Sequence, residues 1–101
     1  MTQREAKEIS LEVWRYLAAH PEIDRKKNLP NEIISKIKHC YNKCPLCDLF
    51  YYDFVCPDCP LETCYDGSLY DDWLWGSEAQ RAIAALKIVE KIEAWEPEEG
   101  V

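Results

Sequence analysis

Hydrophobic and polar positions alternate with a helical period over two long stretches of the chain. The first covers about residues 3–19 and begins with a Thr-Gln-Arg-Glu capping box at Thr2. The second follows a Ser-Glu-Ala-Gln capping box at Ser77 and ends near Trp95. The pattern predicts two long amphipathic helices that pack antiparallel. Their predicted seam consists of Ile9, Val13, Leu17, Ile83, Leu86 and Val89.

Two shorter helices are predicted on either side of residues 44–64, a stretch that has no helical period. The first is capped by Asn28, holds Pro30 in its first turn and runs to about Tyr41. The second covers residues 68–75, with a serine that caps it and a glycine that ends it. Alternating side chains inside the intervening stretch predict either two very short strands or an irregular loop.

The chain of 101 residues is long enough for one modest hydrophobic core, and 48% of its residues are hydrophobic. We predict a mainly α fold: a small helical bundle of about three helices plus a short fourth, with an inserted zinc-knuckle or zinc-ribbon-like module. Its parts are the N-terminal helices (1–42), the cysteine-rich metal module (43–65), the short and C-terminal helices (66–95) and an acidic tail (96–101).

No apolar run is long enough to cross a bilayer, and the charged N-terminus lacks the apolar core of a secretory signal. These features predict a cytoplasmic protein without a membrane partner. Thiols stay reduced in that compartment, so clustered cysteines there bind metal more often than they form disulfides.

Five of the six cysteines lie within residues 44–64, and four of them form two Cys-Pro-X-Cys pairs. Such a pair supplies two thiolates from one tight turn, and a structural zinc needs four ligands in a tetrahedron. We therefore predict Zn²⁺, with iron or an iron–sulfur cluster as the alternative metal. The ligands are four of Cys44, Cys47, Cys56, Cys59 and Cys64, with the first four as first choice. Cys40 is expected to be a small buried side chain outside the metal site.

An enzymatic interpretation is weaker. His20-Pro-Glu22, followed by Cys44 and Cys47, imitates the His-X-Glu…Pro-Cys-X2-Cys signature of zinc deaminases. However, Lys43 takes the place of the proline, and the chain lacks the strands of a central sheet. A redox dithiol would need a βαβ frame, which is also missing. A zinc closed by four cysteines leaves no position for a substrate, so we expect no catalytic residues.

Charge separates the two parts of the chain. Residues 1–43 carry nine basic and six acidic side chains, whereas residues 44–101 carry three and thirteen. Eight of the twelve aromatic residues lie within residues 50–75, where they alternate with acids. These rings either pack the metal module onto the helices or form an acidic-aromatic face that binds a host or viral protein. For that face we select Tyr51, Tyr52, Asp53, Tyr70, Asp71, Asp72 and Trp73.

The basic segment 25–43 offers an alternative function, because zinc modules beside basic patches often bind the phosphates of nucleic acids. The neighbouring acids would repel that backbone, so protein binding is the preferred prediction.

The assembled pattern resembles small cysteine-rich proteins encoded by bacteriophages and prophages. The matching features are Trp14, Cys44-Pro-Leu-Cys47, Cys56-Pro-Asp-Cys59-Pro-Leu61, Cys64, Tyr70-Asp-Asp-Trp73 and the helix over residues 81–95. The resemblance implies a bacterial host cytoplasm and transfers no activity. Together with the residues, it predicts a non-catalytic zinc-binding accessory protein that binds a host or viral protein. Inhibition of that protein is one form this function could take.

Overall fold

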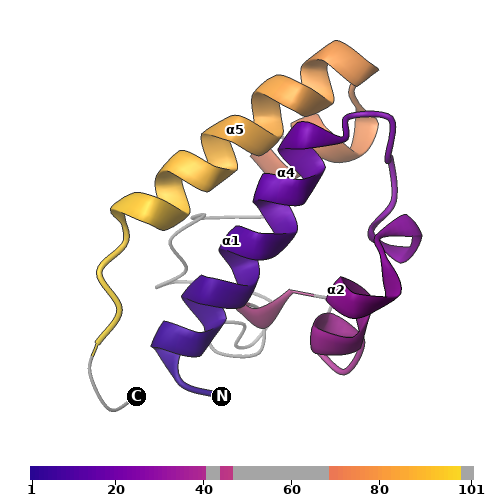
Figure 1. The fold of residues 1–101 in the computed structure, drawn as a ribbon. Helices are drawn as coiled ribbons and strands as arrows, with labels where there is room; N and C mark the ends of the chain where they lie inside the picture. Colours follow the sequence, from indigo (N-terminus) through magenta and orange to yellow (C-terminus); the bar gives the residue numbers. More distant parts are fainter. Residues whose placement is uncertain (41–43, 47–68, 99–101) are drawn as a thin grey trace.

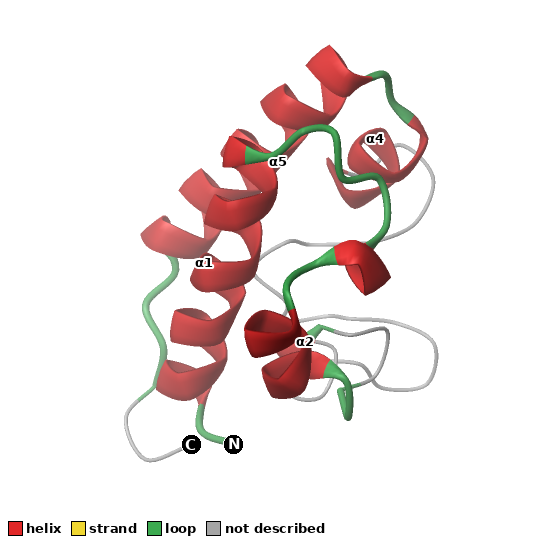
Figure 2. Cartoon of the chain, turned by 45° about the vertical axis from the view of Figure 1, so that its right-hand side comes forward, coloured by secondary structure: helices red, strands yellow, loops and turns green. Residues whose placement is uncertain are grey.

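A computed structural model describes residues 1–40, 44–46 and 69–98. Every regular element in these ranges is helical, which confirms the mainly α prediction (Figure 2). The elements are α1 (Gln3–Ala19), the 3₁₀-helix η1 (Lys26–Asn28), α2 (Asn31–Ile37), α4 (Leu69–Trp75) and α5 (Glu78–Ala94). The predicted metal module and its possible strands fall outside the described residues, apart from residues 44–46. None of the described helices has the length and apolar character that a membrane span requires.

The two long helices, α1 and α5, lie side by side and run in opposite directions (Figure 1). Hydrogen bonds at both ends of the pair link them. The ammonium of Lys7 donates to the carbonyl oxygen of Trp95 at 2.6 Å. At the other end, Nε of Arg81 donates to the carbonyl oxygen of Pro21 at 2.8 Å. The predicted antiparallel packing is therefore confirmed.

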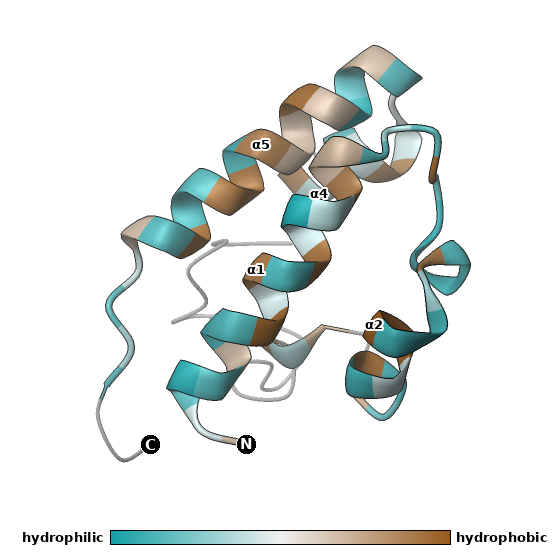
Figure 3. Cartoon of the chain, in the orientation of Figure 1, coloured by the Kyte–Doolittle hydropathy of each residue, from teal (hydrophilic) through white to brown (hydrophobic). Residues whose placement is uncertain are grey.

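The face that α5 turns toward the core matches the predicted seam at Val89 and differs from it at the other two predicted positions. Its buried side chains are Ala84, Ala85, Ile88, Val89 and Ile92. Ile83 and Leu86, both predicted to lie in the seam, are instead 55% and 54% exposed. Because α5 packs against both α1 and α4, its small alanines face inward and these two larger residues face outward. Hydrophobic and hydrophilic positions accordingly alternate around the α5 ribbon (Figure 3).

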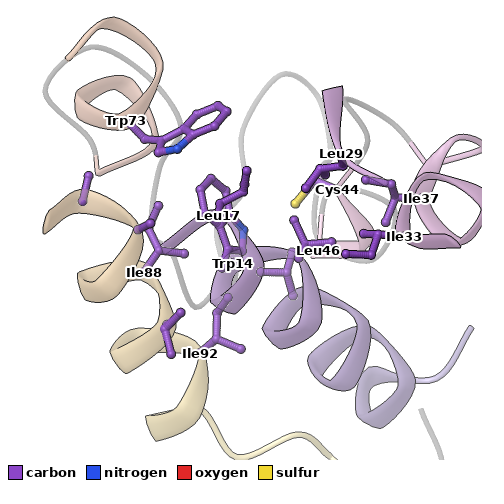
Figure 4. Close-up of a cluster of buried hydrophobic side chains, with 14 of the residues drawn as sticks. Trp14, Leu17, Leu29, Ile33, Ile37, Cys44, Leu46, Trp73, Ile88 and Ile92 are labelled. Atoms are coloured by element: carbon purple, nitrogen blue, oxygen red, sulfur yellow. The ribbon is translucent and has the colours of Figure 1, made fainter. Parts of the chain in front are cut away.

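Two tryptophans from different helices meet in the core (Figure 4). Trp14 of α1 and Trp73 of α4 pack edge to face, with 5.3 Å between ring centroids and an interplanar angle of 86°. This is a favoured geometry for aromatic pairs, because the positive edge of one ring meets the negative face of the other. From Trp14 the core continues to α2 and residues 44–46 through Leu29, Ile33, Ile37, Cys44 and Leu46.

Side chains at the N-termini of both long helices satisfy backbone N–H groups, but only the second capping box forms in full, because the carboxylate of Glu5 accepts from the hydroxyl of Thr2 at 3.2 Å instead of from its N–H. The hydroxyl of Thr2 accepts from the N–H of Glu5 at 3.1 Å. Both halves of the second capping box form, because the Ser77 hydroxyl accepts from the N–H of Gln80 at 3.3 Å and the Gln80 carbonyl accepts from the N–H of Ser77 at 2.7 Å. These bonds explain why α1 and α5 begin where predicted.

The predicted boundaries of the second helix were wrong. Asn28 ends η1, and α2 begins at Asn31, with Pro30 as its N-cap. The ring of a proline disfavours the helical conformation in the residue before it, and Leu29 is accordingly extended, with φ −65° and ψ 157°. The helix also ends earlier than predicted, at Ile37.

The corner between α4 and α5 depends on a glycine. Helix α4 ends at Trp75, immediately before Gly76, as predicted, while its predicted serine cap lies outside the described residues. A Cβ atom on Gly76 would collide with the carbonyl oxygen of Asp72 and lie 2.8 Å from Cβ of Gln80. The requirement is one of space, because the φ angle of Gly76 lies outside the left-handed region.

We predict that Gly76→Ala lowers the free energy of unfolding by about 1–3 kcal/mol, the usual cost of forcing an extra carbon into a packed site. Urea denaturation followed by far-ultraviolet circular dichroism measures the change. Alanine would normally stabilise a chain at a compatible glycine by about 0.4–1 kcal/mol. An unchanged or increased stability would therefore contradict the close approach.

Candidate functional site

A groove lies between α4 and α5, with a volume of about 370 Å³. Its walls are α4 and α5, which are joined at the Gly76 corner and contact each other. Its lining residues combine apolar, acidic and basic side chains: Leu69, Asp71, Asp72, Trp75, Gly76, Gln80, Ile83, Ala84 and Lys87.

The most exposed large hydrophobic side chain in the described ranges, Trp75, lines this groove. It is 73% exposed, whereas Trp73, two residues earlier, is 0% exposed. Residues two apart on a helix point to nearly opposite sides, so burying one of these tryptophans turns the other outward. The prediction that Trp73 belongs to a partner-binding face was wrong for this reason. Trp73 follows Tyr70 by three residues, a spacing that places both side chains on one side of a helix. This sequence signal could have identified Trp75 as the exposed ring.

The acidic residues predicted on α4 do come together at the groove. Asp71 is half-buried and Asp72 is exposed, and both line the α4 wall. Lys87 lies on the α5 wall. In the described part of the chain no ion pair joins Asp72 to Lys87. The two walls therefore present opposite charges to whatever enters the groove.

Tyr70, also selected for the partner-binding face, packs mainly inward. It is half-buried, and its ring lies 6.1 Å from the ring of Trp14, centroid to centroid. The remaining selected residues, Tyr51, Tyr52 and Asp53, lie outside the described residues. The described part of the predicted face therefore consists of Asp71 and Asp72, to which the structure adds Trp75.

A buried lysine connects η1 to both aromatic helices. Lys26 is 6% exposed, and its ammonium lies over two rings, 4.7 Å from the centroid of Tyr70 and 5.5 Å from that of Trp14. A cation over an aromatic face is attracted by the negative charge of the π-system. This lysine of the basic segment therefore serves the core, a role that the sequence analysis did not predict.

The rest of the basic segment 25–43 is also partly used within the molecule. The ammonium of Lys36 pairs with the carboxylate of Glu12 at 2.8 Å. Lys27 and Lys38 are exposed. Lys26 is buried and the exposed Lys36 is paired with a carboxylate, so fewer cations are available to bind phosphates than the sequence suggests.

Of the predicted metal ligands, only Cys44 falls within the described residues. It is 6% exposed and packs in the core near Leu29 and Ile37 (Figure 4). Cys40 is buried to the same extent, as expected. Cys47, Cys56, Cys59 and Cys64 lie outside the described residues. Within residues 1–40, 44–46 and 69–98, no three His, Cys, Asp or Glu side chains are grouped to hold a metal ion.

The histidine of the deaminase-like motif has local partners. His20 is the C-cap of α1, and its ring stacks on Tyr16 with 4.1 Å between centroids. Its Nδ1 lies 3.2 Å from a carboxylate oxygen of Glu22. These contacts suit a residue that closes a helix.

Comparison of the chain with protein-family models, with curated proteins and with solved structures found no match. Function must therefore be inferred from the residues of the chain, and the resemblance to phage-encoded proteins stays a prediction.

We predict an energetic coupling between Lys26 and Tyr70 of about 0.5–2 kcal/mol, because the ammonium over the ring is shielded from water. A double-mutant cycle with Lys26→Met and Tyr70→Leu, read from urea denaturation, measures it. Lys27→Met provides the matched control, since this neighbouring lysine is exposed. A coupling that is no larger for Lys26 than for Lys27 would contradict the cation–π contact.

Proposed function

We propose that the chain is a non-catalytic, zinc-binding accessory protein of the phage type, which binds a host or viral protein through the α4–α5 groove. The observation that carries the proposal is the exposure of Trp75, at 73%, beside the carboxylate of Asp72 in this groove. Tryptophan is enriched among the residues that dominate binding energy at protein interfaces, because it buries a large area with few rotatable bonds.

The apolar surface near Trp75 supports protein binding. Ile83 lines the same groove and is 55% exposed. Exposed apolar side chains that gather in one concave place, with polar groups around them, mark interaction sites more often than isolated ones do. A partner that covered both side chains would remove their apolar surface from water.

Charge supports a basic partner surface. Residues 44–101 carry thirteen acidic and three basic side chains, and Asp72 contributes one of these acids at the groove. Acidic surfaces accelerate encounter with basic partners and repel the phosphates of nucleic acids. The burial of Lys26 and the pairing of Lys36 with Glu12 make nucleic-acid binding the weaker candidate.

In this proposal a zinc ion stabilises the cysteine-rich module, with Cys44, Cys47, Cys56 and Cys59 as ligands and Cys64 as a possible substitute. The spacing of the two pairs and the affinity of thiolates for zinc support this set. Cys44 packs against the core, so a metal held by its sulfur would attach the module to the helices. A closed site of this kind supplies folding energy.

We expect native mass spectrometry of protein purified without added metal to detect one zinc per chain. Cys47→Ser should lose the metal, whereas Cys40→Ser should keep it, because Cys40 lies outside the proposed ligand set. Chelation should lower the midpoint of thermal unfolding, since the binding energy of a structural zinc contributes to folding. A metal-free chain with no titratable thiols would indicate disulfides and contradict the proposal, while bound iron would reassign the metal.

We also expect a protein to copurify with the tagged full-length chain from the cells of its host, in stoichiometric amount. Trp75→Ala should reduce its retention at least about tenfold, the effect of removing a central interface residue. Leu86→Ala is the matched control, because Leu86 is 54% exposed and does not line the groove. The proposed function would be contradicted if Trp75→Ala retained the copurified protein as well as the unaltered chain does, or if nucleic acid alone were recovered.

A further inference from the structure

The chemistry of the groove indicates which side chain of a partner it accepts, an inference that rests on the proposed function. Asp72 and Trp75 are three residues apart on α4, a spacing that places side chains on the same side of a helix. Both line the groove. An aromatic face and a carboxylate therefore stand next to each other at an exposed surface.

Neither group is used by the described part of the chain. Within it, no ion pair or hydrogen bond engages the carboxylate of Asp72, and no cation lies over the ring of Trp75. The contrast with the core is direct, because there Lys26 already occupies the faces of Trp14 and Tyr70. The ring of Trp75 and the carboxylate of Asp72 both attract cations, and among the described residues neither is paired with one, although Lys87 lines the opposite wall.

Arginine fits this pair better than lysine. Its guanidinium is planar and weakly hydrated, so it can stack on an indole and still donate in its own plane to a carboxylate. A lysine ammonium is a compact, strongly hydrated charge that does not stack. Two other lining residues indicate what should flank this arginine in the partner. Ile83 presents an apolar surface, and Lys87 disfavours a second cation nearby.

We propose that the α4–α5 groove binds an arginine side chain of the partner protein, stacked on Trp75 and paired with Asp72, while an adjacent apolar side chain of the partner covers Ile83. The complementary charge of Asp72 and the exposure of Trp75 and Ile83 support this occupant. In this arrangement Lys87, on the α5 wall, disfavours a second basic side chain near the apolar one.

The test is a titration of the ¹⁵N-labelled full-length chain, as purified, with the blocked dipeptide acetyl-Arg-Leu-amide. Amide shifts of groove residues such as Gln80 and Lys87 report binding. The citrulline analogue, which has the same shape without the charge, should bind at least about fivefold more weakly, because charge-assisted hydrogen bonds are roughly twice as strong as neutral ones. Asp72→Asn should weaken binding of the arginine peptide by a similar factor and leave the citrulline peptide unaffected.

Two matched variants separate the groove from the general surface of α5. Ile83→Ser should weaken binding of acetyl-Arg-Leu-amide at least about threefold, the effect of losing one apolar contact. Leu86→Ser should have no effect, although Leu86 is equally exposed, because it lies outside the groove. Equal binding of the citrulline peptide, or equal effects of the two serine variants, would overturn the assignment.

A failure of the arginine assignment can be distinguished from a failure of the proposed function. If the dipeptide fails while the copurified protein still depends on Trp75, the arginine assignment is wrong and protein binding stands. If the dipeptide binds as expected while no protein depends on Trp75, the arginine site stands and the proposed function is wrong. Concentration-dependent dimerisation that Arg25→Gln abolishes would identify a second copy of the chain as the occupant and overturn a separate partner.

Discussion

The indole of Trp14 is the contact on which the arrangement of the helices depends. It is 2% exposed and belongs to α1, yet it touches side chains of two other elements. The edge-to-face contact with Trp73 attaches α4 to α1, and the ammonium of Lys26 over its ring attaches η1. Aromatic pairs of this geometry contribute about 0.5–1.5 kcal/mol beyond the area they bury. Because the three elements share one ring, the position of each depends on the other two.

The exposed site follows from this buried contact. Burial of Trp73 sets the rotation of α4 about its own axis, and that rotation turns Trp75 outward. The Gly76 corner and the capping box at Ser77 then fix the direction of α5, so that Ile83 completes the groove. A binding surface built on helices whose ends are capped loses little conformational entropy when a partner docks. The proposed arginine site therefore draws its geometry from packing on the far side of the same short helix.

The uneven charge of the chain acquires a physical meaning in the fold. Two cations of its basic half have partners within the chain, because the Lys26 ammonium lies over aromatic rings in the core and Lys36 pairs with Glu12 at the surface. Of the acids on α4, Asp71 is half-buried, whereas Asp72 is exposed and lines the groove without a partner among the described residues. The same asymmetry, taken from composition alone, supported both nucleic-acid and protein binding. The burial of Lys26 and the pairing of Lys36 favour protein binding over nucleic-acid binding.

Local signals in the sequence determined the helical class, the bounds of α1 and the start of α5, because capping boxes act within three or four residues of the backbone that they satisfy. The effect of Pro30 on Leu29 was equally local and was missed. Two features were decided only by tertiary structure: the exposure of Ile83 and Leu86, and the choice between Trp73 and Trp75 as the exposed ring. An apolar period shows that a helix has a buried side. Which side that is depends on the neighbours that pack against it, and α5 has two of them, α1 and α4.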